Sequence, residues 1–249
     1  MKPTSPLSSK LPPSDSDFPT AAMIFAAGLG TRMRPFTDSV PKPLARVAGK
    51  ALIDYALDDF AQAGVTRAIV NVHHLADQIE AHLAARTSPR VVISDERALL
   101  LDQGGGIKKA LPQFEGKPFF ICNTDAFWND AGAANLLALA GAWDAEKMDV
   151  ALLLAPTTGS VGVDWDGDFE LDAEGRVSQP PGARRYVYSG VGIIKPELFS
   201  GVGEDVFKLA PFFFNAVRQG RLFGVAAQGL WLHVGTVAAI AEAEKAVAA

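Results

Sequence analysis

Residues 21–37 read AAMIFAAGLGTRMRPFT, an apolar run that ends in two glycines and is followed by two arginines. The apolar run predicts a buried β-strand, and the glycines predict a tight loop at its carboxyl end. Glycines let backbone N–H groups approach a bound anion closely, and Arg32 and Arg34 add full positive charges. The stretch therefore predicts an anion-binding loop that directly follows a strand.

A lysine follows the loop in the sequence Pro41-Lys42-Pro43-Leu44. The two flanking prolines restrict the backbone and hold the lysine in a defined position. A glycine loop, the Arg32 guanidinium and a fixed lysine together predict a binding site for a triphosphate.

The rest of the chain alternates between helix and strand patterns. Apolar residues at helical spacing predict helices over residues 50–63, 75–86, 131–143 and 205–219, and Thr236 is expected to cap a last helix. Apolar runs predict strands over residues 21–27, 68–72, 91–94, 118–125, 150–154, 186–194, 222–225 and 230–234. This order predicts an α/β, Rossmann-like fold with a mixed, mostly parallel central sheet flanked by helices.

Three consecutive glycines, Gly104 to Gly106, interrupt this pattern. Glycine destabilises the interior of a helix, so the glycines are expected to precede a short helix over residues 107–111.

Composition limits the function classes. The net charge of −5 argues against nucleic-acid binding, which needs a basic surface. The single cysteine, Cys122, excludes an internal disulfide and fits a reducing, cytoplasmic compartment. No apolar run approaches the roughly 20 residues of a membrane span. Residues 1–20 contain five prolines and five serines and are expected to form a disordered tail, not a signal peptide.

Asp125 ends an apolar strand, at the sheet edge where ligands gather in open α/β folds. A carboxylate there is a suitable ligand for Mg²⁺, whose other positions phosphate oxygens can fill. His233 also ends a strand, and two interpretations stay open: a hydrogen-bonded residue at the sheet end, or a second metal or phosphate contact. His73 and His74 are interpreted as turn or packing residues, because neighbours on a strand point to opposite faces.

The glycine loop does not match the common nucleotide-binding motifs. A dinucleotide fingerprint needs a third glycine where this chain has Met33, and an acidic residue after the second strand is absent. The P-loop sequence is absent as well.

The residues from Phe25 to Thr37, followed by Pro41-Lys42-Pro43-Leu44, resemble the signature of the sugar-nucleotidyltransferases. The resemblance continues through residues 52–55, 104–106, 123–125, 189–191 and 234–236. Within that family the chain is most similar to the short bacterial N-acetylmuramate α-1-phosphate uridylyltransferases of cell-wall recycling. The resemblance implies a GT-A-like nucleotidyltransferase domain over residues 21–249 without a β-helix domain, with a nucleotide-binding part (21–130) and a sugar-binding part (131–249).

The resemblance also implies roles for particular residues. It assigns catalysis to Arg32 and Lys42, and a metal ion, Mg²⁺ or Mn²⁺, to Asp125 with His233. It implies that the nucleotide is bound by Ala27, Gly28, Gly30, Thr31, Arg32, Lys42, Gln103 and Gly104. The last two would face the base. It implies that the sugar is bound by Asn123, Asp168, Ser189 and Gly190.

The implied partners are a nucleoside triphosphate and a sugar 1-phosphate, without nucleic acid or membrane, for a monomer or small homo-oligomer. The chain departs from the family at His233, where relatives usually carry an aspartate. A mannose-1-phosphate guanylyltransferase is an alternative within the family, and a non-catalytic nucleotide-sugar-binding protein is an alternative of another class.

Overall fold

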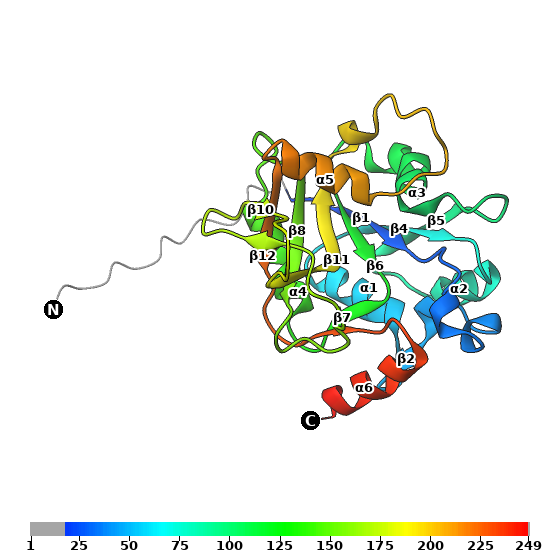
Figure 1. The fold of residues 1–249 in the computed structure, drawn as a ribbon. Coiled ribbons are helices and arrows are strands. Elements are labelled where there is room, and N and C mark those ends of the chain that lie inside the picture. Colours follow the sequence, from blue (N-terminus) through cyan, green and yellow to red (C-terminus); the bar gives the residue numbers. More distant parts are fainter. Residues whose placement is uncertain (1–17, 249) are drawn as a thin grey trace.

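The computed structural model of the chain describes residues 18–248 (Figure 1). Its centre is a seven-stranded sheet in the order β12-β8-β11-β6-β1-β4-β5. The strands are β1 (Ala21–Phe25), β4 (Arg67–Val72), β5 (Arg90–Asp95), β6 (Phe119–Asn123), β8 (Val150–Pro156), β11 (Tyr186–Ile194) and β12 (Leu222–Ala226).

The sheet is mixed and mostly parallel, as the sequence predicted. Strand β1 pairs in parallel with β4 and β6, β4 with β5, and β8 with β12, whereas β11 runs antiparallel to β6 and β8. Ala21 to Ile24 of β1 are all buried, as expected of a central strand covered on both faces. The carboxyl ends of β1, β4, β5 and β6 therefore lie at one edge of the sheet.

Helices cover both faces of the sheet and form three layers with it (Figure 1). Helices α1 (Leu52–Gln62), α2 (Ala76–Leu83) and α4 (Gly132–Ala142) bury their apolar residues in the core of one face. Helices α3 (Asp102–Ala110) and α5 (Ala210–Arg218) do so on the other face. The elements thus match a doubly wound α/β fold.

Short ribbons and the last helix complete the fold. The ribbons are β2 (Arg46–Val47) with β3 (Lys50–Ala51), β7 (Ala126–Trp128) with β13 (Trp231–His233), and β9 (Glu170–Leu171) with β10 (Val177–Ser178). Helix α6 (Val237–Val247) packs in a third apolar cluster with residues of the first two ribbons. The Thr236 hydroxyl accepts a hydrogen bond from the Ala239 N–H, which confirms the predicted cap.

Two predicted helix boundaries were wrong. Helix α3 begins at Asp102 and contains the three glycines, which the sequence placed outside a helix. Helix α5 begins at Ala210 and not at residue 205. Both differences come from the segment 205–207, which runs against α3 so closely that only glycine fits. A Cβ on Gly105 would overlap the Asp205 carbonyl oxygen, and one on Gly104 would lie 2.8 Å from the Phe207 carbonyl oxygen.

The start of the folded part also differs from the predicted one. Phe18 packs edge-on against Phe120 at 5.9 Å, and the Thr20 carbonyl accepts the backbone N–H of Thr66 and Arg67. Residues 18–20 therefore belong to the fold. The rest of the predicted tail, residues 1–17, lies outside the described residues.

One sheet spans the predicted boundary at residue 130. Strands β1, β4, β5 and β6 come from the part before it, and β8, β11 and β12 from the part after it. None of the helices in the described part of the chain is long and apolar enough to cross a membrane.

Candidate active site

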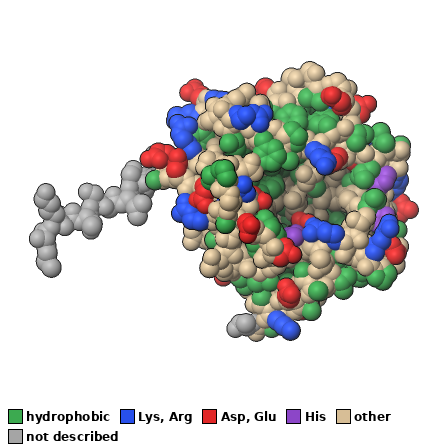
Figure 2. Space-filling view, viewed as in Figure 1, with side chains coloured by type: hydrophobic (Ala, Val, Ile, Leu, Met, Phe, Trp, Pro, Cys, Tyr) green, Lys and Arg blue, Asp and Glu red, His purple; other side chains and the backbone are tan. Residues whose placement is uncertain are grey.

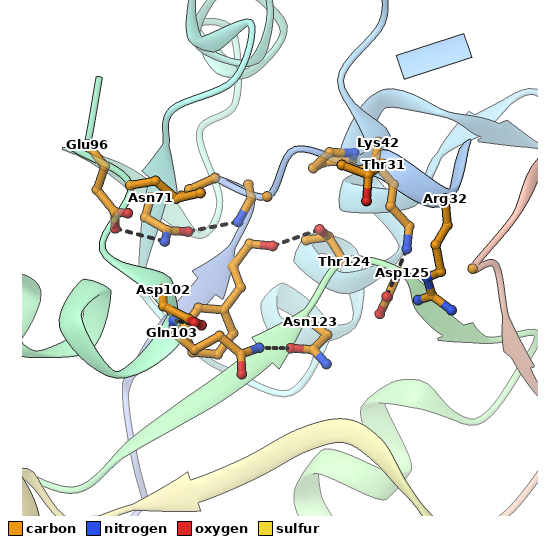
Figure 3. Close-up of a pocket in the computed structure, with 18 of the residues that line it drawn as sticks. Thr31, Arg32, Lys42, Asn71, Glu96, Asp102, Gln103, Asn123, Thr124 and Asp125 are labelled. Carbon is orange, nitrogen blue, oxygen red and sulfur yellow. Dashed lines mark hydrogen bonds and ion pairs between the residues drawn. The ribbon is translucent and has the colours of Figure 1, made fainter. Parts of the chain in front are cut away.

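A cleft of about 510 Å³ opens at the sheet edge where β1, β4, β5 and β6 end (Figure 3). Most of the predicted nucleotide-binding residues line it. These are Ala27, Gly28, Gly30, Thr31, Arg32, Lys42 and Gln103, and they are joined by the predicted sugar residue Asn123 and the predicted metal ligand Asp125.

The glycine loop has the backbone that the sequence predicted. Gly30 has a φ of +62°, and a Cβ there would lie 2.8 Å from the Thr37 side chain, so only glycine fits without strain. The Thr37 hydroxyl fixes this turn by donating to the Gly30 carbonyl at 2.9 Å. Gly28 is exposed and has no atom within 4 Å of the position of a Cβ, so a ligand can approach its backbone.

Two side chains anchor the start of the loop from neighbouring strands. The Ala26 N–H donates to Asn71 Oδ1 at 2.8 Å, and the Thr124 hydroxyl donates to the Phe25 carbonyl at 2.8 Å. Both anchoring residues lie at the carboxyl ends of strands that flank β1. Neither residue was predicted to have a role, although a polar residue that ends a buried strand is a signal for this edge.

Lys42 begins a short 3-10 helix, Lys42–Leu44, between the two prolines. Its Nζ lies 2.9 Å from Asp125 Oδ2, and the side chains are 13% and 26% exposed. The ion pair joins the two residues that the sequence predicted for the phosphates and the metal (Figure 3). Both groups are thus charged and face the cleft.

His233 lies next to Asp125, and its Nε2 is 3.8 Å from Asp125 Oδ2. Its Nδ1 is 3.2 Å from the Gly162 carbonyl, which can only accept, so Nδ1 carries the proton. The ring is parallel to that of Trp231 and packs edge-on against Trp165. This arrangement points Nε2 at Asp125, as suits either a protonated partner of the carboxylate or a second metal ligand.

Burial would raise the pKa of Asp125, but the nearby His233 and the charge of Lys42 lower it further than burial raises it. Asp125 is therefore a carboxylate at neutral pH.

Within residues 18–248, no group of three or more His, Cys, Asp or Glu side chains is placed to hold a metal ion. Both protein contacts of Asp125 use Oδ2, which leaves Oδ1 for a metal ion. The site therefore fits Mg²⁺ bound by one carboxylate, with phosphate oxygens of the substrates as further ligands.

The opposite wall of the cleft comes from α3 and the residues before it. The Gln103 side-chain amide donates to Asn123 Oδ1 at 2.8 Å, which joins this wall to the end of β6. Leu100, Asp102 and Val206 also line the cleft, and none of them was predicted as a site residue.

Five predicted residues do not line this cleft: His233, described above, and four others. Gly104 is buried in α3, where its N–H donates to the Phe207 carbonyl at 3.0 Å. The Ser189 hydroxyl donates to the Leu153 carbonyl in the core, and Asp168 accepts from the Trp165 indole and the Tyr188 N–H. Gly190 has a φ of +91° and lies against Asn123, which lines the cleft.

The interpretation of His73 and His74 was confirmed. His73 Nδ1 lies 2.7 Å from the Glu96 carbonyl, and His74 Nε2 lies 2.6 Å from the Thr37 carbonyl, so both are turn and packing residues. Cys122 is buried in the core, and burial raises the pKa of its thiol.

The chain is similar over most of its length to two relatives that share one name. The chain is 47% identical over 239 residues to the N-acetylmuramate alpha-1-phosphate uridylyltransferase of Caulobacter vibrioides, with 94% of this chain and 99% of the relative covered. It is 39% identical over 227 residues to the protein of the same name from Neisseria meningitidis serogroup B, with 90% and 96% covered.

Solved structures share the fold. The inositol-1-phosphate CTP transferase from T. maritima superposes with a TM-score of 0.71 at 19% identity, covering 92% of this chain and 96% of that one. Residues 22–160, more than half of the chain, match the family described as the MobA-like NTP transferase domain. With its glycine loop, its lysine and its carboxylate at one sheet edge, the chain belongs to the MobA-like NTP transferase family.

Proposed function

We propose that this protein makes UDP-N-acetylmuramate and pyrophosphate from UTP and N-acetylmuramate α-1-phosphate. The observation that carries the proposal is the 47% identity, over almost the whole chain, to an enzyme of that name. The cleft supports it, because an anion-binding loop, a lysine and a carboxylate meet at one edge of the sheet.

The reaction is a displacement at phosphorus. A phosphate oxygen of the sugar 1-phosphate forms a bond to the α-phosphorus of UTP, and the bond from that phosphorus to the bridging oxygen of pyrophosphate breaks. The attacking oxygen already carries negative charge, so no general base is required. Catalysis then depends on alignment of the reactants and on neutralisation of the charge that develops on the phosphoryl oxygens.

The charged residues and the glycine loop of the cleft each have a place in this scheme. The backbone N–H groups from Gly28 to Thr31 and the Arg32 guanidinium bind the triphosphate. Lys42 neutralises charge at the α-phosphate. Asp125, alone or with His233, would hold Mg²⁺, and the ion would supply further positive charge to the phosphate groups.

Other residues, in the cleft and around it, distinguish the two substrates. Gln103 faces the base, and Asn123 lies between base and sugar through its hydrogen bond with Gln103. Gly190, Ser189 and Asp168 belong to the sugar side, Ser189 and Asp168 by holding the backbone that surrounds it. UTP is a cytoplasmic nucleotide, so the proposal places the protein in the cytoplasm, in the recycling of cell-wall sugars.

The test is pyrophosphate release over a grid of four nucleoside triphosphates and several sugar 1-phosphates, with Mg²⁺ or Mn²⁺. The expected result is the highest kcat/KM with UTP and N-acetylmuramate α-1-phosphate. A higher value with GTP and mannose 1-phosphate would assign the alternative activity within the family. Tight binding of UTP without any turnover would contradict an enzymatic role.

A further inference from the structure

Two buried polar side chains lie between the glycine loop and the α3 wall of the cleft. Asn71 is on β4 and is 3% exposed, and Glu96 directly follows β5 and is 1% exposed. Both border the cleft, yet neither has a part in the proposed reaction (Figure 3). A buried carboxylate is costly unless it is hydrogen-bonded, so this pair needs a physical explanation.

The pair forms a continuous chain of hydrogen bonds. The Ala26 N–H donates to Asn71 Oδ1 at 2.8 Å, and Asn71 Nδ2 donates to Glu96 Oε1 at 2.9 Å. The Leu101 N–H then donates to Glu96 Oε2 at 3.2 Å. The chain thus connects the backbone before the glycine loop to the backbone that begins α3.

The backbone of Glu96 is fixed as well. Its N–H donates to the Val72 carbonyl at 2.8 Å, and its carbonyl lies 2.7 Å from His73 Nδ1. These contacts tie Glu96 to β4, the same strand that carries Asn71. The position of the carboxylate is therefore set by the sheet and not by α3.

Helix α3 rests directly on the pair through the third glycine of its triplet. A Cβ on Gly106 would lie 2.8 Å from Glu96 Oε1 and 3.1 Å from Asn71 Nδ2. The first two glycines of the triplet accommodate the segment 205–207 on the other side. The helix is thus held between that segment and the Asn71–Glu96 pair.

Both carboxylate oxygens of Glu96 already accept hydrogen bonds from the protein, so they are not available to read a base. Burial raises the pKa of Glu96, and the hydrogen bonds from Asn71 and Leu101 work in the opposite direction. The geometry therefore favours an indirect role.

We propose that Asn71 and Glu96 are positioning residues that set the spacing between the glycine loop and the α3 wall. A nucleotide that touches both walls needs this spacing, whereas an inorganic phosphate chain touches only the loop. The inference rests on the proposed function in that it takes the α3 wall as the base side.

The first test replaces the carboxylate with an amide in Glu96→Gln. One end of the new amide must place an N–H against a donor, either Asn71 Nδ2 or the Leu101 N–H, so one link is lost. Titration calorimetry is expected to show UTP binding at least about tenfold weaker, which is ~1.4 kcal/mol. Binding of inorganic triphosphate is expected to change less than about threefold, as is the KM for the sugar 1-phosphate.

The second test restores the chain with its polarity reversed. In the double variant Asn71→Asp, Glu96→Gln, the new aspartate accepts from the Ala26 N–H and from the new amide, whose oxygen accepts from the Leu101 N–H. Every donor again has an acceptor. UTP affinity is expected to return to within about threefold of the parent, whereas Asn71→Asp alone faces Glu96 with a second acceptor and stays weak.

The outcomes separate this inference from the proposed function. If the parent binds another nucleoside triphosphate and not UTP, the proposed nucleotide substrate is wrong. The same variants are then titrated with the nucleotide that binds. Equal weakening of nucleotide and inorganic triphosphate by Glu96→Gln overturns the inference, as does a folded double variant without recovery. If Glu96→Gln does not fold, Glu96→Asp keeps the charge, shortens the link by one methylene and carries the same expectation.

Discussion

At the scale of single residues, the cleft is defined by the ion pair between Lys42 and Asp125. The sequence predicted both residues from their surroundings, the lysine from its prolines and the aspartate from the end of its strand. It did not predict that they touch, because 83 positions separate them and only the sheet brings them together. In the same way, Asn71 and Glu96 gave no recognisable motif, since their function depends on a contact between neighbouring strands.

Substitution Lys42→Ala is expected to lower kcat by about 10²-fold or more with a smaller change in KM, because its charge acts mainly in the transition state. Steady-state pyrophosphate release measures both constants. Lys50→Ala is the matched control, since Lys50 pairs with Asp58 outside the cleft and is expected to keep kcat within about twofold. A parental kcat in Lys42→Ala would exclude the assigned role.

Substitution Asp125→Asn removes the only carboxylate of the described residues that lines the cleft beside Lys42. The Mg²⁺ concentration for half-maximal activity is expected to rise about tenfold or more, because a neutral amide is a weaker ligand than a carboxylate. Asp130→Asn, five positions along the chain and exposed, is the control. Superimposable Mg²⁺ titrations of Asp125→Asn and the parent would remove Asp125 as the metal ligand.

At the scale of elements, helix α3 shows where sequence patterns are insufficient. The periodic helices and apolar strands were predictable because each carries its own signal, such as the buried stripe Leu52, Ile53, Ala56, Leu57 and Phe60 of α1. Helix α3 forms although glycine has a low helix propensity. Residues 205–207 and Glu96 pack so closely against the helix that only glycine fits there, and this packing outweighs the propensity. Such a contact is absent from the local sequence.

The substitution Gly105→Ala measures this packing directly. Alanine is the better helix former by about 1 kcal/mol, but its Cβ would overlap the Asp205 carbonyl, so a net loss of about 2 kcal/mol in unfolding free energy is expected. Gly141→Ala in α4 is the matched control, because nothing lies within 4 Å of its Cβ position. Urea unfolding is expected to show Gly141→Ala at or slightly above the parental stability; a similar gain in Gly105→Ala would contradict the packing described here.

Helix α1 contributes a pH dependence where it meets α4. Burial raises the pKa of Asp59 to about 6 from 3.8, Lys50 opposes this, and Asp58 adds to it. Asp59 packs against Gly132, the first residue of α4. Because the folded state holds the proton more tightly, the stability due to this group is full below pH 4 and is lost as the pH rises through about 6.

Substitution Asp59→Asn is therefore expected to stabilise the protein at pH 7.5 and not at pH 4. The shift in pKa corresponds to at most about 3 kcal/mol, and the positive end of α4 reduces that value. Urea unfolding at several pH values measures the difference. An equal effect at both pH values would show that the ionisation of Asp59 is not its cause.

At the scale of the whole molecule, the two halves share one sheet. Strand β11 from the second half lies between β6 and β8, so it covers an edge that the first half would expose. The sequence predicted the alternation of elements and the mixed sheet, but the strand order follows from long-range pairing that no local pattern encodes. A single cooperative unit is the physical consequence.

Equilibrium unfolding in urea is therefore expected to be one transition. Three of the four tryptophans, Trp143, Trp165 and Trp231, lie after residue 130, so tryptophan fluorescence reports mainly on that half, whereas far-UV circular dichroism reports on all helices. The midpoints of the two signals are expected to coincide. Two separate midpoints would show that the halves unfold independently.

The connection between β8 and β11 has a consequence for how such proteins diverge. These strands are antiparallel neighbours, so the 29 residues from 157 to 185, which include the β9–β10 ribbon, form topologically one long hairpin loop. Closing a longer or shorter loop between the same strands costs little free energy. The segment can therefore lengthen, shorten or be exchanged as a whole during evolution while the sheet and the glycine loop at the end of β1 stay the same.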